Sequence, residues 1–202
     1  MVSPGESSRT LWSIGHSNHT IEHFVDLLRS NRIDVVVDVR TSPYSKFAQQ
    51  FAREVLASVL PRADVKYLFL GKELGGRPTG GRYYDRDGHV LYGELARADL
   101  FRAGIDRLEQ GMAQYRCAIM CSEENPCVCH RHLLVSRVLR DRGTDIRHIR
   151  GDGRCETFVQ AEREARELEG RVETLFGEEA PHPWRSLRSV LQDAARAGSS
   201  ET

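Results

Sequence analysis

The sequence lacks the long apolar runs and the excess of one charge that mark membrane proteins and broad polyanion binders. It has no apolar run of about 18 residues, and its start shows no hydrophobic signal region, so we expect a soluble, cytoplasmic chain without a membrane partner. Lys and Arg total 29 and Asp and Glu also total 29, which gives a formal net charge of zero. Net charge therefore does not indicate nucleic acid as a partner, although a local basic patch stays open.

The chain also lacks the dispersed cysteines of a disulfide scaffold. It has five cysteines, and four of them crowd into residues 117–129. That clustering favours reduced thiols over a disulfide framework. No internal repeat is present, and 202 residues are enough for one domain with its own core.

Short apolar runs alternate with helical patterns along most of the chain. This alternation predicts a single α/β domain with a mostly parallel sheet of about five strands flanked by helices. The strands are expected at residues 11–15, 35–39, 65–70, 117–121 and 145–149. We expect a disordered N-terminus at residues 1–10, the core domain at 11–155, and a helical C-terminal extension at 156–202. That extension should hold a last helix around residues 184–195 and a frayed end.

The segment from 121 to 131, CSEENPCVCHR, joins an apolar strand to a helix. Asn125 and Pro126 are typical of an N-cap and a first helical residue, because Asn accepts an orphan amide hydrogen bond and Pro has none to donate. The pattern predicts a helix that starts at Pro126 and continues through the apolar positions that follow. Thr20 is expected to cap an earlier helix in the same way.

Five separated phrases resemble, in order, the domain of unknown function 488 family. They are IGHSN at 14–18, VVVDVR and SPYSKF at 35–47, LGGR at 74–77, CSEENPCVCHR at 121–131 and HI at 148–149. The fourth phrase has the family form C-x-E-x-x-P-x-x-C-H-R. The resemblance covers about residues 11–155; it implies a compact α/β domain, carries no reaction with it, and gives Cys127 no role.

Polar residues follow several of the predicted strands and predict a site at one sheet edge. In parallel sheets a ligand binds outside the carboxyl ends of the strands, so the loops there should meet. Acid, base or nucleophile candidates are Cys121, Glu123, His16 and His130. Substrate-binding candidates, chosen for their hydroxyl, imidazole or guanidinium groups, are Ser17, Arg40, Ser45, Arg77, Arg131 and His148.

These residues predict an enzyme, a hydrolase or a transferase, that acts on a small phosphate- or nucleobase-bearing substrate such as a nucleotide. Arginines suit the phosphate, and Glu123 suits the polar edge of a base. One alternative is rhodanese-like or other thiol chemistry at Cys121, where a helix N-terminus favours the thiolate. Another is a ligand-binding or nucleic-acid-processing module without turnover. The oligomeric state does not follow from the sequence.

A metal-binding protein is a further alternative, because soft donors lie close together in the sequence. Zinc or iron would draw on Cys121, Cys127, Cys129, His130 and His132. Structural zinc usually uses two separated ligand pairs, however, and Cys127 and Cys129 would diverge if both lay on one helix. We therefore predict no cofactor and no metal ligands.

Overall fold

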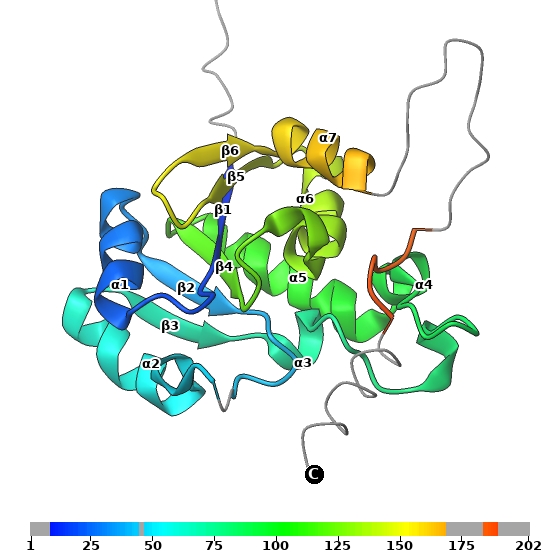
Figure 1. Ribbon diagram of the computed structural model, residues 1–202, viewed down its shortest axis with the longest axis horizontal. Helices are drawn as coiled ribbons and strands as arrows, with labels where there is room; N and C mark the ends of the chain where they lie inside the picture. The colour runs from blue at the N-terminus through cyan, green and yellow to red at the C-terminus, as the bar shows by residue number, and fades with distance from the viewer. Residues whose placement is uncertain (1–8, 45–46, 169–183, 190–202) are drawn as a thin grey trace, which may run out of the picture.

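Five parallel strands and one antiparallel edge strand form the sheet in the computed structural model, which describes residues 9–44, 47–168 and 184–189 (Figure 1). The strand order is β3-β2-β4-β1-β5-β6. The strands are β1 (Thr10–Gly15), β2 (Val35–Asp38), β3 (Lys66–Phe69), β4 (Cys117–Cys121), β5 (Asp145–Ile149) and β6 (Cys155–Thr157). The predicted α/β fold with a mostly parallel sheet is confirmed, with β6 as one strand more than expected.

The central strands are buried on both faces, which explains their uniformly apolar composition. All residues of β2 and all residues of β4 are buried. Val36 contacts one core cluster while Val35 and Val37 contact the other, as the two-residue period of a strand requires. A parallel sheet covered by helices on both faces selects such β-branched runs.

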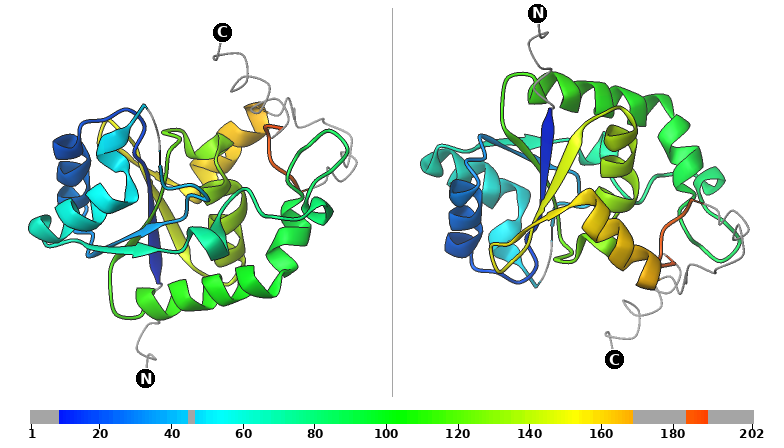
Figure 2. Two further views of the ribbon diagram at one scale, coloured as in Figure 1. Left: turned by 90° about the horizontal axis from the view of Figure 1, so that it is seen from below. Right: turned by 90° about the horizontal axis from the view of Figure 1, so that it is seen from above.

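Helices cover the two faces of the sheet (Figure 2). One face carries α1 (Ile21–Ser30) and α2 (Arg53–Val59), whose Phe24, Leu28 and Leu56 pack into its core. The other face carries α5 (Asp99–Met112) and α6 (Arg137–Asp141). The remaining α-helices of the described residues are α3 (Gly71–Leu74), α4 (Tyr92–Arg97) and α7 (Phe158–Leu168). Thr20 caps α1 as predicted, because its hydroxyl accepts a hydrogen bond from the His23 amide at 3.2 Å.

The predicted continuous helix from Pro126 is wrong. Asn125 does cap a helical turn, since its side-chain oxygen accepts from the Cys127 amide at 2.8 Å. This 3-10 turn (Pro126–Val128) ends at Cys129, whose φ of −111° and ψ of 140° are extended. The chain becomes helical again at His130 and passes through a π-helical stretch (Arg131–Ser136) into α6. Cys127 and Cys129 therefore do not share a helix.

The C-terminal part departs from a purely helical extension. Residues 155–157 join the sheet, and α7 packs beside it. Trp184 to Ser189 run beside α4 without helical structure, and Arg185 forms an isolated β-bridge with Leu91. The helix expected at 184–195 is thus wrong for 184–189, and its remainder lies outside the described residues. So do residues 1–8, while Thr10 already belongs to β1. None of the helices in the described ranges is long and apolar enough to cross a bilayer.

Candidate functional site

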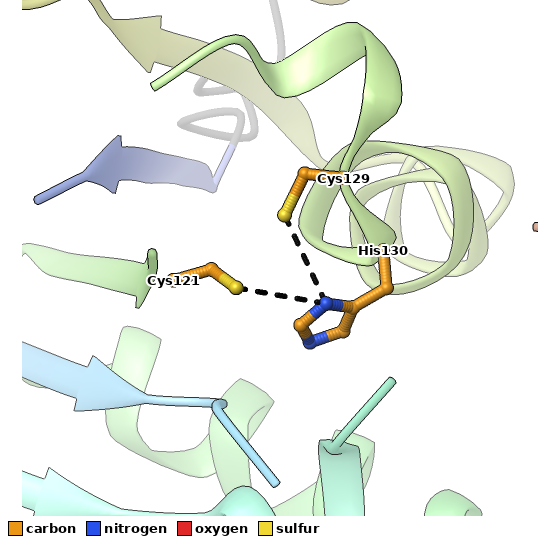
Figure 3. Close-up of side chains that lie close together, drawn as sticks. All are labelled: Cys121, Cys129 and His130. Atoms are coloured by element: carbon orange, nitrogen blue, oxygen red, sulfur yellow. Dashed lines mark hydrogen bonds between the residues drawn. The ribbon is translucent and has the colours of Figure 1, made fainter. Parts of the chain in front are cut away.

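Two thiols, a carboxyl group and an imidazole meet where β4 ends. The Cys121 Sγ lies 3.0 Å from Glu123 Oε2, and the Cys129 Sγ lies 3.3 Å from the same oxygen. Each sulfur is 3.8 Å from Nδ1 of His130 (Figure 3). Cys121 is the last residue of β4, Cys129 is the extended residue after the 3-10 turn, and His130 begins the helix that follows. We call Cys121, Glu123, Cys129 and His130 the thiol cluster.

The His130 ring is fixed by its second nitrogen. Nε2 lies 3.0 Å from the Val39 carbonyl oxygen, just beyond β2. A carbonyl oxygen only accepts, so Nε2 carries a hydrogen and Nδ1 is the atom that faces the sulfurs. Gly76 lies directly against the ring, and a Cβ there would come within 2.6 Å of His130 Cγ. A glycine at this point of the LGGR phrase therefore leaves room for the imidazole.

The cluster is buried, and its members change one another's pKa. A hydrogen bond from Cys129 holds the pKa of Cys121 well below its usual range, against the effect of burial, and His130 lowers it further. Burial, followed by the hydrogen bond to Cys121, raises the pKa of Cys129 well above its usual range. Burial and the neighbouring Cys121 also raise the pKa of Glu123. Cys121 is therefore the thiol that ionises first, and Glu123 retains a proton more readily than an exposed carboxyl group.

Arg131 holds the loop that carries Glu123 through hydrogen bonds to its backbone. This side chain has no exposed surface, and its guanidinium donates to the carbonyl oxygens of Glu123 and Glu124, the latter at 2.5 Å. Gly15 permits the same loop to cross the end of β1, because a Cβ at residue 15 would overlap the Glu123 carbonyl. Arg150 holds the Glu124 carboxylate with two hydrogen bonds, of 3.0 and 2.9 Å. Backbone anchoring thus fixes the position of the thiol cluster.

A pocket of about 500 Å³ opens beside the thiol cluster. Cys121, Glu123 and His130 line it, together with loops that follow β2 and α3. Arg77 and Arg188 also line it, so that reactive groups and cationic side chains border the same space. Arg188 belongs to the segment 184–189, which crosses beside α4. The predicted site at the carboxyl edge of the sheet therefore coincides with a cavity.

Arg40 lines the pocket, but most of its donors are engaged elsewhere. Nε and Nη2 bond Asp38 at 2.9 and 2.7 Å, and Nη2 also donates to the Phe51 carbonyl at 2.8 Å. Nη1 lies 3.0 Å from Nε2 of His16, whose Nδ1 lies 2.8 Å from the Ser17 carbonyl. His16 is therefore neutral, with Nδ1 protonated, and burial lowers its pKa to about 4. His16 stands behind Arg40 and orients it.

The model of the family described as "Domain of unknown function DUF488" matches residues 20–138, more than half of the 202 residues. The chain belongs to this family. No curated protein and no solved structure matches it. The DUF488 region includes every member of the thiol cluster, whereas Arg188 lies beyond it.

The structure brings together some of the predicted residues of this DUF488 chain and separates others. The pocket is lined by Cys121, Glu123, His130, Arg40 and Arg77. The other described candidates do not line it: His16, Ser17, Arg131 and His148. His148 is fully buried in β5, with Nδ1 2.6 Å from the Ser13 hydroxyl and Nε2 3.0 Å from Nδ1 of His132. Ser45 lies outside the described residues.

Sequence reasoning missed three residues of the site. From the sequence, Cys129 is only a possible metal ligand on a helix, although the C-H-R end of its phrase marks it. Tyr92, at the start of α4, lines the pocket, and burial raises its pKa well above the usual range, with Cys129 and Glu123 adding to the effect. Arg188 had no local signal, because only long-range packing brings its segment to the pocket.

Proposed function

We propose that this DUF488 protein is an enzyme that acts on a small substrate bearing a phosphate or a nucleobase. The observation that carries the proposal is that three members of the thiol cluster and three arginines border one pocket of about 500 Å³. Pockets of this size are typical of small-molecule sites. A hydrolase or a transferase fits a site that combines groups able to transfer protons with cationic side chains.

Anion recognition is assigned to Arg77 and Arg188. Guanidinium groups bind phosphate through two parallel N–H donors, which gives both affinity and orientation. The Arg77 amide donates to Oγ1 of Thr41 at 3.0 Å, which fixes this loop beside the one that follows β2. Arg40 adds positive potential from the wall, but its bonds to Asp38 leave it a smaller part in direct contact.

Proton transfer is assigned to Glu123. A carboxyl group whose pKa is raised holds a proton more readily than an ordinary carboxyl group, so it suits the protonation of a leaving group. Its Oε2 is held by both sulfurs of the cluster, and its backbone is held by Arg131. The surroundings of the Glu123 carboxyl group therefore both fix its position and raise its pKa.

A specific observation also supports thiol chemistry at Cys121 as a second candidate. The pKa of Cys121 is well below its usual range. Burial alone would lower the pKa of His130, but the neighbouring Cys121 raises it above the usual value for histidine. This is the arrangement of a nucleophilic cysteine beside a histidine. A rhodanese-like transfer would use Cys121 as the acceptor of the transferred group.

A screen of nucleotides and nucleosides tests the proposal. Binding is measured by thermal shift, and turnover by mass spectrometry of the products. We expect Glu123→Gln to retain binding and lose turnover, and Arg77→Ala to weaken binding; Arg102→Ala on α5, an exposed arginine paired with Asp99, serves as the matched control. Binding by the wild type without turnover would favour the module alternative. Turnover that survives Cys121→Ser would remove the thiol candidate.

A further inference from the structure

Three soft donor atoms of the thiol cluster lie at one point in space. They are Sγ of Cys121, Sγ of Cys129 and Nδ1 of His130, all within 4.8 Å of one another and all from buried residues (Figure 3). We infer that these three residues bind a zinc ion next to the pocket. The inference is separate from the proposed substrate, because it rests on the donor set alone.

The spacing of the donors fits the ion. Zinc binds thiolate sulfur at about 2.3 Å and imidazole nitrogen at about 2.0–2.1 Å, so a tetrahedral site separates sulfur from nitrogen by about 3.6 Å. Both S···N distances in the cluster are 3.8 Å. Shifts of a few tenths of an ångström would therefore complete the site. A single N–H···S hydrogen bond has no reason to hold Nδ1 equally far from two sulfurs.

The histidine is oriented for coordination. Its Nε2–H faces the Val39 carbonyl at 3.0 Å, so the lone pair of a neutral ring lies on Nδ1 and faces the two sulfurs. Metal-binding histidines commonly donate their other N–H to a carbonyl or carboxylate, which fixes the tautomer and the ring. Val39 supplies this outer partner from the loop after β2.

The protons displaced by the ion have an acceptor. Binding converts two thiols to thiolates and releases two protons. Oε2 of Glu123, 3.0 and 3.3 Å from the two sulfurs, takes one of them, and the other leaves through the pocket that Glu123 lines. Two thiolates then balance the two charges of zinc, which limits the cost of burying them.

The break at Cys129 overturns one of the two sequence-based reasons against a metal site, namely that Cys127 and Cys129 lie on one helix. Cys127 does diverge, since its Sγ donates to the Ala161 carbonyl at 3.2 Å, and His132 bonds His148. Cys129 is extended instead, so its sulfur turns to Cys121. The ligand set is thus Cys121, Cys129 and His130, without Cys127 or His132.

Three protein ligands leave a fourth position for water or substrate. Because Cys121 and His130 line the pocket, this position is reached from it. Two cysteines and one histidine with an open position are typical of catalytic zinc. If the proposed function holds, the ion would polarise the substrate, with the protonated Glu123 close by as proton donor.

Elemental analysis of the full chain, produced without a histidine tag in zinc-supplemented medium, tests the inference. We expect about one zinc per chain after gel filtration, and loss of the ion in Cys121→Ser, Cys129→Ser and His130→Gln. Cys127→Ser, a buried cysteine two residues from Cys129, is the matched control and should retain it. Circular dichroism checks that each variant is folded. Exchange with Co²⁺ should give the thiolate charge-transfer and d–d absorption of a tetrahedral site in the wild type.

Several results would overturn the inference. Wild-type protein that contains no stoichiometric zinc and shows no such absorption with Co²⁺ has no site of this kind. Equal zinc content in Cys129→Ser and the wild type would place the ion elsewhere, and stoichiometric iron would contradict the assignment of the metal. The zinc measurements use no substrate, so they are independent of the nucleotide screen. Zinc binding without nucleotide binding or turnover would refute only the proposed function, and nucleotide turnover without zinc would refute only the zinc site.

Discussion

Arg131 offers a direct test of how the site is built. The sequence suggested it as a substrate-binding residue, but the structure buries it completely, with two donors on the carbonyls of Glu123 and Glu124. Hydrogen bonds to charged groups contribute about 1.5–3 kcal/mol each, so Arg131→Met removes roughly 3–6 kcal/mol and leaves two carbonyls without partners. Relief from burying a cation subtracts from this figure. We expect the free energy of unfolding to fall by about 3 kcal/mol.

Urea unfolding followed by circular dichroism measures the change. Arg131→Lys should be destabilised as well, because one ammonium group cannot reproduce the fork that reaches both carbonyls. The control is Arg102→Met, an exposed arginine on α5 whose replacement should change stability by less than about 0.5 kcal/mol.

The opposite pattern would refute this reasoning. If Arg131→Met unfolds within about 1 kcal/mol of the wild type, the two hydrogen bonds do not hold the loop. If the folded variant loses nucleotide binding while Arg77→Ala retains it, Arg131 contacts the substrate, as the sequence had suggested. We therefore expect the replacement of Arg131 to lower stability and the replacement of Arg77 to weaken binding.

Three further predictions concern the surroundings of the thiol cluster. Burial lowers the pKa of His16 to about 4, below the value of about 6.5 in the unfolded chain, so the unfolded state binds the extra proton and stability falls as pH drops from 6.5 towards 4. Between pH 6.5 and pH 4, the free energy of unfolding of His16→Gln, measured with urea, should fall by roughly 3 kcal/mol less than that of the wild type. An equal dependence of stability on pH in the two proteins would contradict this. Gly15→Ala should displace the Glu123 loop and destabilise the fold by roughly 2 kcal/mol in thermal unfolding, whereas an unchanged melting temperature would show that the loop adapts. Asn125→Ala should cost about 1 kcal/mol through loss of the cap on Cys127, and a neutral result by urea unfolding would show that water replaces it.

The strands were predictable because their signal is local. β2 and β4 are buried on both faces, and nothing but a continuous apolar run suits that environment. The carboxyl-edge rule then brought Cys121, Glu123 and Arg77 to one pocket without any knowledge of side chains. Topology alone therefore accounts for the location of this pocket.

The rule does not say towards which face a side chain points. His148 precedes the last residue of β5. The two-residue period of the strand turns its side chain to the face of the sheet where it meets Ser13 of β1, and not towards the pocket. Arg131 fails for a related reason, since a polar residue on the inward stripe of a helix can serve the backbone as well as a ligand. Arg188 comes from a segment whose position depends on a bridge between Arg185 and Leu91, far apart in sequence.

The break in the helix at Cys129 brings its sulfur to Cys121, and it leaves no backbone group of Cys129 without a hydrogen bond. The Cys129 amide donates to the Pro126 carbonyl at 2.9 Å, and its own carbonyl accepts from the amides of His132 and Leu133, each at 3.0 Å. The backbone groups of the interrupted residue are thus satisfied, because Cys129 closes one helical turn and opens the next helix. An uninterrupted helix would gain no further hydrogen bond at this residue and would turn its sulfur away from Cys121. The meeting of the two thiols therefore depends on a backbone conformation that the pattern of apolar residues does not record.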